Sequence, residues 1–157
     1  MGKGLGIATL FLASVGLVHP GLVAAQTRGK TVAGSTYVTG GVTVAELRKL
    51  DGEKDNYSLW ITTAAKESGA YLSDVKLKIT GAKKQVVLDT TMIGPWLMVD
   101  LPAGKYTVEA GFKDQTQKRT THIRAGEHEQ MIMYFESPAE VSPDWVSPFK
   151  DSPYSGK

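Results

Sequence analysis

Leu101-Pro-Ala-Gly-Lys-Tyr-Thr-Val108 is the stretch of sequence that decides the fold class. Its Pro-X-Gly turn separates two runs that alternate apolar and polar residues, a pattern typical of a β-hairpin. Tyr106 lies two residues after Gly104, as in the tyrosine corner of immunoglobulin-like domains, where the hydroxyl bonds back to the preceding loop. We therefore predict structural roles for Pro102, Gly104 and Tyr106. The alternative for Tyr106 is a simple core aromatic.

The same period-two alternation recurs along most of the chain. It marks seven short segments, at 57–61, 75–79, 86–90, 97–101, 106–112, 116–123 and 130–135. Gly and Pro residues stand between these segments, where turns are needed. Short strands at this spacing predict an all-β fold, a seven-stranded Ig-like or prealbumin-like β-sandwich.

One short helix is predicted ahead of these strands, from about 43 to 52, where a glycine closes it. Thr43 and Glu46 form a T-x-x-E capping box, and Val42 and Leu47 are spaced for the hydrophobic staple around it. A helix of this length is not stable alone. We therefore expect it to pack on the sandwich.

The N-terminal residues have the pattern of a secretory signal peptide. Lys3 precedes a fourteen-residue uncharged run from Leu5 to Val18, and Val23-Ala-Ala25 places small residues at a cleavage position. As a helix this run would rise about 21 Å, short of the roughly 30 Å hydrocarbon core of a membrane. We therefore expect cleavage after Ala25, no membrane anchor afterwards, and a soluble periplasmic or secreted product.

Composition divides the rest of the chain into three parts. Residues 26–41 are rich in Gly, Thr and Ser and lack periodicity, so we expect a flexible linker. Residues 42–136 carry the predicted helix and strands and form the sandwich domain. Residues 137–157 form a tail rich in Ser-Pro pairs.

The tail has a regular pattern of its own. Ser-Pro recurs every five residues from Ser137, and Trp145, Phe149 and Tyr154 fall between the repeats. Repeated proline favours extended polyproline II segments. These three aromatics are therefore candidate contacts for grooves of a partner. The alternatives are a tail without structure in isolation, or one that folds back over an edge strand of the sandwich.

Composition also excludes several classes of function. The chain has no cysteine, so disulfides, thiolate metal sites and a cysteine nucleophile are excluded. Its 18 basic and 16 acidic residues are mixed along the sequence, which argues against nucleic acid or an acidic membrane as partner. Neither a Gly-rich phosphate loop nor a Gly-X-Ser-X-Gly motif is present. We expect no cofactor and no catalytic residue.

Glu127-His128-Glu129 is the one local cluster with metal-ligating side chains. Neighbouring strand residues point to opposite faces, so only a loop would bring all three together. A Zn²⁺ site needs three or four converging ligands. The alternatives are a polar turn and a metal site that uses His122 and His128.

Aromatic residues near the predicted turns are candidate ligand-binding residues. Trp96 follows Gly94-Pro95, and Tyr71 lies in another predicted end loop, where sandwich proteins usually gather binding residues. The alternative for Trp96 is that it closes the end of the core. Trp60 alternates with its apolar neighbours, so we expect it on the outer face, under the short helix.

Three segments together resemble the carboxypeptidase regulatory-like domains of the transthyretin-like, prealbumin-type sandwich group: Ser68-Gly-Ala-Tyr-Leu-Ser-Asp-Val75, Gly94-Pro-Trp-Leu97 and Leu101-Pro-Ala-Gly-Lys-Tyr106. The likeness covers about 42–135 and is closest to small, mostly uncharacterised exported proteins of Gram-negative bacteria. It implies the sandwich fold and a non-catalytic accessory role. Hydroxyisourate hydrolases of similar fold end in Tyr-Arg-Gly-Ser, and this chain, which ends in Tyr154-Ser-Gly-Lys157, does not match them.

These observations favour a non-catalytic, exported binding or accessory module of the bacterial cell envelope. Its expected partner is an envelope protein, a peptide or a glycan, engaged by the tail or by the end-loop aromatics. Two alternatives remain open at this point. One is a self-assembling structural subunit that uses exposed edge strands, and the other is a metal-dependent hydrolase.

Overall fold

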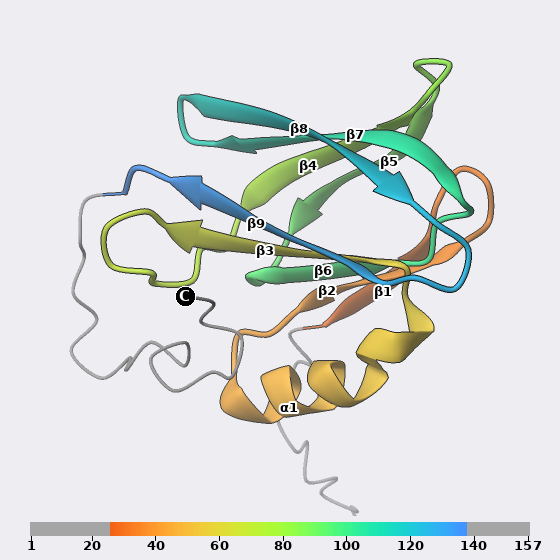
Figure 1. Ribbon diagram of the computed structural model, residues 1–157. Coiled ribbons are helices and arrows are strands. Elements are labelled where there is room, and N and C mark those ends of the chain that lie inside the picture. The colour runs from red at the N-terminus through yellow and green to blue at the C-terminus, as the bar shows by residue number, and fades with distance from the viewer. Residues whose placement is uncertain (1–25, 138–157) are drawn as a thin grey trace, which may run out of the picture.

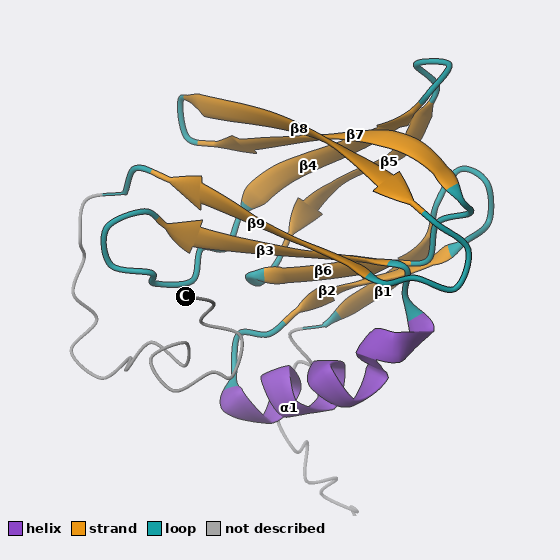
Figure 2. Ribbon diagram, in the orientation of Figure 1, coloured by secondary structure: helices purple, strands orange, loops and turns teal. Residues whose placement is uncertain are grey.

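The computed structural model describes residues 26–137, in which two sheets face each other and one helix covers part of an outer face (Figures 1 and 2). The five-stranded sheet has the spatial order β1 (Thr27–Lys30), β2 (Thr36–Gly40), β6 (Trp96–Val99), β3 (Leu59–Ala65) and β9 (Glu129–Phe135). The four-stranded sheet has the order β5 (Val86–Met92), β4 (Val75–Gly81), β7 (Gly104–Phe112) and β8 (Gln115–Ile123). Neighbouring strands are antiparallel except β3 and β9, which run parallel.

The all-β sandwich predicted from sequence is confirmed, but residues 26–137 contain nine strands rather than seven. The two additional strands, β1 and β2, lie in the segment predicted to be a flexible linker, so that prediction is wrong. β2 pairs along its length with β6. Val38 is buried beneath the helix, and Tyr37 packs on the core between the sheets. Because β2 is covered on both faces, its sequence does not show the alternation of a half-buried strand.

The predicted helix is present as α1 (Val44–Glu53) and continues into a 3₁₀ turn, η1 (Lys54–Asn56). Its capping box is formed: Thr43 Oγ1 accepts from Glu46 N at 3.2 Å, and the Glu46 carboxylate accepts from Thr43 N at 3.3 Å. Gly52 does not close the helix as predicted. A glycine that ends a helix usually has a positive φ, and Gly52 does not, so the helix continues through it to Glu53.

Two hydrophobic clusters of buried residues stabilise the part of the chain that the structure describes. The larger lies between the sheets and includes Ile61, Leu77 and Phe135 among its fully buried side chains. The smaller joins α1 to the outer face of the five-stranded sheet through six buried residues, Val38, Leu47, Leu50, Tyr57, Trp96 and Met98. Trp60 packs against this second cluster, where the sequence placed it.

The β-hairpin predicted at 101–108 is wrong: β6 and β7 lie in different sheets, so this segment is a loop that joins the two sheets of the sandwich. The loop still contains the predicted backbone contact. Tyr106 Oη donates to the carbonyl oxygen of Pro102 at 2.8 Å. The Tyr106 ring lies 3.6 Å from the position that a Cβ on Gly104 would occupy. The hydroxyl therefore fixes the loop that leads into β7.

Strand register sorts the connecting loops into two ends of the sandwich. Ala65 pairs with Phe135, so β3 and β9 end together. In the other sheet Lys76 pairs with Gly111, which places the start of β4 beside the β7–β8 turn. The β4–β5 turn lies at the opposite end, because Gly81 pairs with Tyr106. We call the end where β3 and β9 finish the C-terminal end of the sandwich.

Candidate functional site

A hollow of about 490 Å³ opens at the C-terminal end of the sandwich. It lies among the β3–β4 loop, the β7–β8 turn and the residues after β9. Its lining includes Tyr71, Asp74, Phe112, Lys113 and Ser137. We call this space the loop hollow. It contains Tyr71, one of the two end-loop aromatics selected from sequence.

Backbone hydrogen bonds hold the β3–β4 loop in one shape. Ala65 N donates to Ala70 O at 2.7 Å, and Leu72 N donates to Thr63 O at 3.1 Å. Thr63 Oγ1 donates in turn to Leu72 O at 2.7 Å. Gly69 supplies the positive φ, 69°, that the tight turn requires. The rim of the loop hollow is therefore ordered before any ligand arrives, which lowers the entropic cost of binding.

Two residues of the loop hollow have an unusual backbone conformation. Asp74 has φ 60° and Lys113 has φ 53°, in the left-handed region that non-glycine residues rarely occupy. Such residues often mark functional sites, because the surrounding structure must offset their strain. Lys84, with φ 63°, is the other one in the described part, and it lies at the opposite end. An exposed carboxylate and an exposed ammonium thus line the same hollow.

Tyr71 lines the loop hollow and also packs against the smaller hydrophobic cluster, the one beneath α1. Its ring is half-buried. Burial raises the pKa of the Tyr71 phenol, and the neighbouring Trp96 side chain opposes that increase. The hydroxyl therefore stays protonated at neutral pH, so it offers a neutral hydrogen-bonding group.

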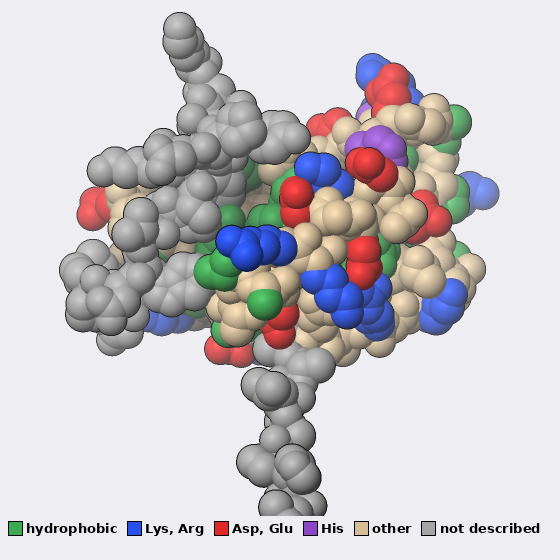
Figure 3. Space-filling model, turned by 90° about the horizontal axis from the view of Figure 1, so that it is seen from below, with side chains coloured by type: hydrophobic (Ala, Val, Ile, Leu, Met, Phe, Trp, Pro, Cys, Tyr) green, Lys and Arg blue, Asp and Glu red, His purple; other side chains and the backbone are tan. Residues whose placement is uncertain are grey.

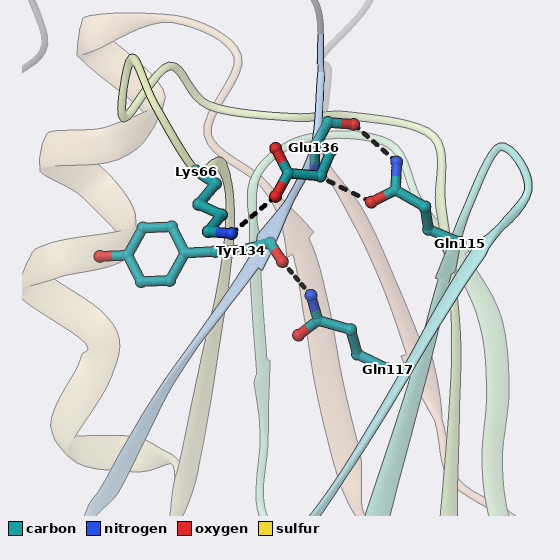
Figure 4. Close-up of polar contacts among 5 residues, drawn as sticks. All are labelled: Lys66, Gln115, Gln117, Tyr134 and Glu136. Atoms are coloured by element: carbon teal, nitrogen blue, oxygen red, sulfur yellow. Dashed lines mark hydrogen bonds and ion pairs between the residues drawn. The ribbon is translucent and has the colours of Figure 1, made fainter.

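A second hollow, of about 320 Å³, is lined by residues of β8 and β9 and by two residues that follow strand ends, Lys66 and Glu136. Figure 4 draws five of its lining side chains. Its lining is polar apart from the ring of Tyr134: Lys66, Gln115, Gln117, Arg119, Tyr134 and Glu136. We call it the edge hollow. Lys66 Nζ bonds to Glu136 Oε1 at 2.7 Å, and this hydrogen bond and charge raise the pKa of Lys66. Consecutive residues line the two hollows where the described chain ends: Glu136 lines the edge hollow and Ser137 lines the loop hollow.

A third, smaller hollow of about 150 Å³ lies between η1 and the start of β9. Lys54 Nζ is 6.0 Å from the centroid of the Trp60 ring, at the outer limit of a cation–π contact. His128 Nδ1 lies 2.8 Å from the carbonyl oxygen of Tyr57. On the visible surface of this face, acidic and basic side chains are interspersed and neither sign forms a large patch (Figure 3).

The two histidines are not brought into a metal site among the described residues. His122 is exposed on β8, opposite Lys105 on β7. His128 is exposed in the β8–β9 loop and contacts the backbone of Tyr57. No three His, Asp or Glu side chains within residues 26–137 gather as a metal ion would require.

The remaining predicted aromatics divide into two groups. Trp96 is 7 % exposed and lies in β6, beneath α1, rather than at the mouth of a turn. Trp145, Phe149 and Tyr154 lie outside the described residues. Sequence reasoning did not select the two polar pairs that line the hollows, Asp74 with Lys113 and Gln115 with Gln117. A usable signal for the glutamines was present, because the segment Gln115-Thr-Gln-Lys-Arg119 is polar on both faces.

No family model matches this chain, and no curated protein or solved structure matches it either. Its likeness to carboxypeptidase regulatory-like domains therefore stays a prediction. Across residues 26–137, no helix has the length and apolar character needed to cross a membrane.

Proposed function

We propose that this chain is a non-catalytic, exported binding module of the bacterial cell envelope, which holds a segment of an envelope protein or peptide at the C-terminal end of its sandwich. The observation that carries this proposal is that two hollows open at the end of β9, where Glu136 lines the edge hollow and Ser137 lines the loop hollow. Loops held by a rigid scaffold are where sandwich proteins place their binding residues.

The lining of the loop hollow suits recognition better than catalysis. It combines an aromatic surface from Tyr71 and Phe112 with opposite charges at Asp74 and Lys113. Apolar area with a few fixed polar groups is the usual composition of a binding site. A peptide presents both features, because apolar side chains alternate with charged or amide groups along its backbone.

The Ser-Pro tail extends this proposal. Ser137 lines the loop hollow, and residues 138–157 follow it directly in the sequence. Trp145 is eight residues further on, about 25 Å of chain in a polyproline II conformation. The tail aromatics are therefore within reach of a partner held at the C-terminal end, and we propose that they add to its contacts. The signal peptide and the envelope location also belong to this proposal and rest on the sequence pattern of residues 1–25.

The test is capture of partners from an envelope extract by the purified exported protein. The test variant carries Asp74→Asn and Lys113→Asn, because asparagine tolerates positive φ while removing both charges. Its control is Lys84→Asn, which makes the same change in a left-handed turn at the other end of the sandwich. We expect the double variant to lose partners that the control retains.

A chain ending at Ser137 separates the contribution of the tail. Partners lost only with this truncation would assign the contact to the tail aromatics. Equal capture by all variants would contradict the proposed site, and glycans recovered in place of proteins would change the class of partner.

A further inference from the structure

The outer edge of β9 carries backbone groups that no strand within residues 26–137 pairs with. The odd-numbered residues of β9 direct their backbone groups toward β3. Phe135 O accepts from Lys66 N at 2.9 Å, and Glu129 N donates to Ser58 O at 2.8 Å. In a strand, the N–H and C=O of one residue point to the same side, and the side alternates along the chain. Ile132 and Tyr134 therefore direct both backbone groups away from β3, as does Glu136 just after the strand.

Two glutamine side chains of β8 occupy part of that edge (Figure 4). Gln115 Nε2 donates to Glu136 O at 2.6 Å, and Gln115 Oε1 accepts from Glu136 N at 2.8 Å. Gln117 Nε2 donates to Tyr134 O. The Gln115 amide thus pairs with both backbone groups of one residue, as a residue of a neighbouring strand would.

β8 turns polar residues toward the space between the sheets, where a sandwich strand usually presents apolar ones. In the β7–β8 register Gln117 pairs with Ala110, and Arg119 pairs with Val108. Both partners are fully buried in the core, so Gln117 and Arg119 share the inward face of their sheet. No backbone pairing joins β8 to β9 in residues 26–137, and the edge hollow lies between them.

Geometry and charge select what the edge hollow can hold. β8 borders the hollow on the side away from β9, so the space suits a single extended chain rather than the sheet edge of a second folded copy. Lys66 is balanced by Glu136, whereas Arg119 makes no ion pair with any described residue. The excess positive charge favours an acidic side chain on the occupant.

The Ser-Pro tail of this chain is a poor candidate for that position. Prolines at 138, 143, 148 and 153 divide it into proline-free runs of four residues. Proline has no backbone N–H and interrupts a ladder of hydrogen bonds. An occupant that pairs with successive outward residues of β9 needs a longer proline-free segment.

We infer that the edge hollow accepts an extended, acidic, proline-free segment of a partner protein, which adds to β9 as a further strand. This inference rests on the proposed function and specifies how the partner is held. The incoming N–H groups replace Gln117 at Tyr134 O and Gln115 at Glu136 O. The new ladder also pairs with the outward groups of Ile132, and the added chain covers the Tyr134 ring, now 41 % exposed.

The test uses the protein purified after export and the synthetic peptide Val-Thr-Val-Asp-Val-Thr-Val as the probe. Amide hydrogen exchange is followed residue by residue by NMR. We expect the peptide to slow exchange of the Ile132 and Tyr134 amides by about tenfold or more, because they move from solvent into a ladder. A peptide with Lys in place of Asp should bind about threefold more weakly or worse. One with a central proline should give no protection.

Two variants test the residues of the hollow. Arg119→Glu should weaken binding of the acidic peptide by about threefold or more, whereas Lys105→Glu on the neighbouring strand should not. Gln115→Ala with Gln117→Ala removes the competing side-chain bonds and should strengthen binding. Thr116→Ala, between them on the opposite face of β8, is its control and should leave binding unchanged.

Three results would overturn the inference: no protection of Ile132 and Tyr134, equal binding of the Asp and Lys peptides, or protection seen only in the double glutamine variant. The last result would show that the glutamines simply close the edge against strand addition. If these tests fail while the envelope capture still depends on Asp74 and Lys113, the proposed function stands and only the added strand is wrong.

Discussion

The indole rings of Trp60 and Trp96 meet beneath α1 with their centroids 4.4 Å apart and their planes at 65°. They occupy diagonal positions on neighbouring strands, since Trp60 pairs with Met98 and Trp96 pairs with Thr62. Edge-to-face contact is the preferred geometry for such rings. Because Leu47 of α1 belongs to the same cluster, the tryptophan pair anchors the helix to the sheet.

Removing the more deeply buried ring of this pair should release the helix. We expect Trp96→Ala to lower the free energy of unfolding by about 3–5 kcal/mol, because it deletes a large buried side chain and leaves a cavity. Trp60→Ala should lower the free energy of unfolding by a smaller amount, since Trp60 is partly exposed. Urea unfolding followed by circular dichroism measures both. A larger loss for Trp60 than for Trp96 would contradict the anchoring role.

The tyrosine corner offers a prediction about a single hydrogen bond. Tyr106→Phe keeps the ring and removes the donor to Pro102 O, so we expect a loss of about 1 kcal/mol in the free energy of unfolding. Tyr134→Phe is the control, because no described residue hydrogen-bonds its hydroxyl. Urea denaturation of the two variants gives the comparison. Equal stabilities would mean that Tyr106 acts only as a core aromatic.

Local signals in the sequence were enough to predict the sandwich and its helix. Alternation marks strands that have one face in the core, such as β4, and the Thr43–Glu46 capping box marks the start of α1. The same reasoning missed β1 and β2. In β2, Val38 and Tyr37 lie on opposite faces and are covered by different parts of the molecule, so the strand has no apolar face that alternates with a polar, exposed one.

The candidate site was harder to predict, because its groups meet only through the packing of two sheets. Gln115 and Glu136 lie 21 residues apart, and their bonds depend on how far β8 stands from β9. A turn of Lys113-Asp114 is visible in the sequence, but its place beside Asp74 follows from strand register. Tyr71 was selected because its loop position was predictable, whereas Trp96, predicted at the mouth of a turn, is the first residue of β6 and is buried.

The buried phenol of Tyr71 predicts a loss of stability in alkali. Its pKa is raised in the folded protein, so the unfolded chain releases this proton first as the pH rises above about 10. The stability that the neutral phenol contributes is therefore present below that pH and is lost as the pH rises toward the folded pKa. Tyr71→Phe should remove this part of the alkaline loss. Urea midpoints at pH 7 and above pH 10 test it, and an unchanged pH dependence in the variant would contradict it.

Two glycines predict opposite effects of the same substitution. A Cβ on Gly94 would lie 2.3 Å from the carbonyl oxygen of Gly40, so Gly94→Ala must displace the end of β2. We expect this variant to lose about 1–3 kcal/mol or more in the free energy of unfolding, as overpacked sites do. A Cβ on Gly52 in α1 meets nothing within 4 Å, and the residue has no positive φ. Gly52→Ala should therefore gain about 0.5–1 kcal/mol from the lower backbone entropy of the unfolded chain. Thermal unfolding of both variants beside the parent protein measures the two shifts. An unchanged or raised stability of Gly94→Ala would show that close approach to Gly40 does not govern Gly94, and a loss in Gly52→Ala would contradict the entropic gain.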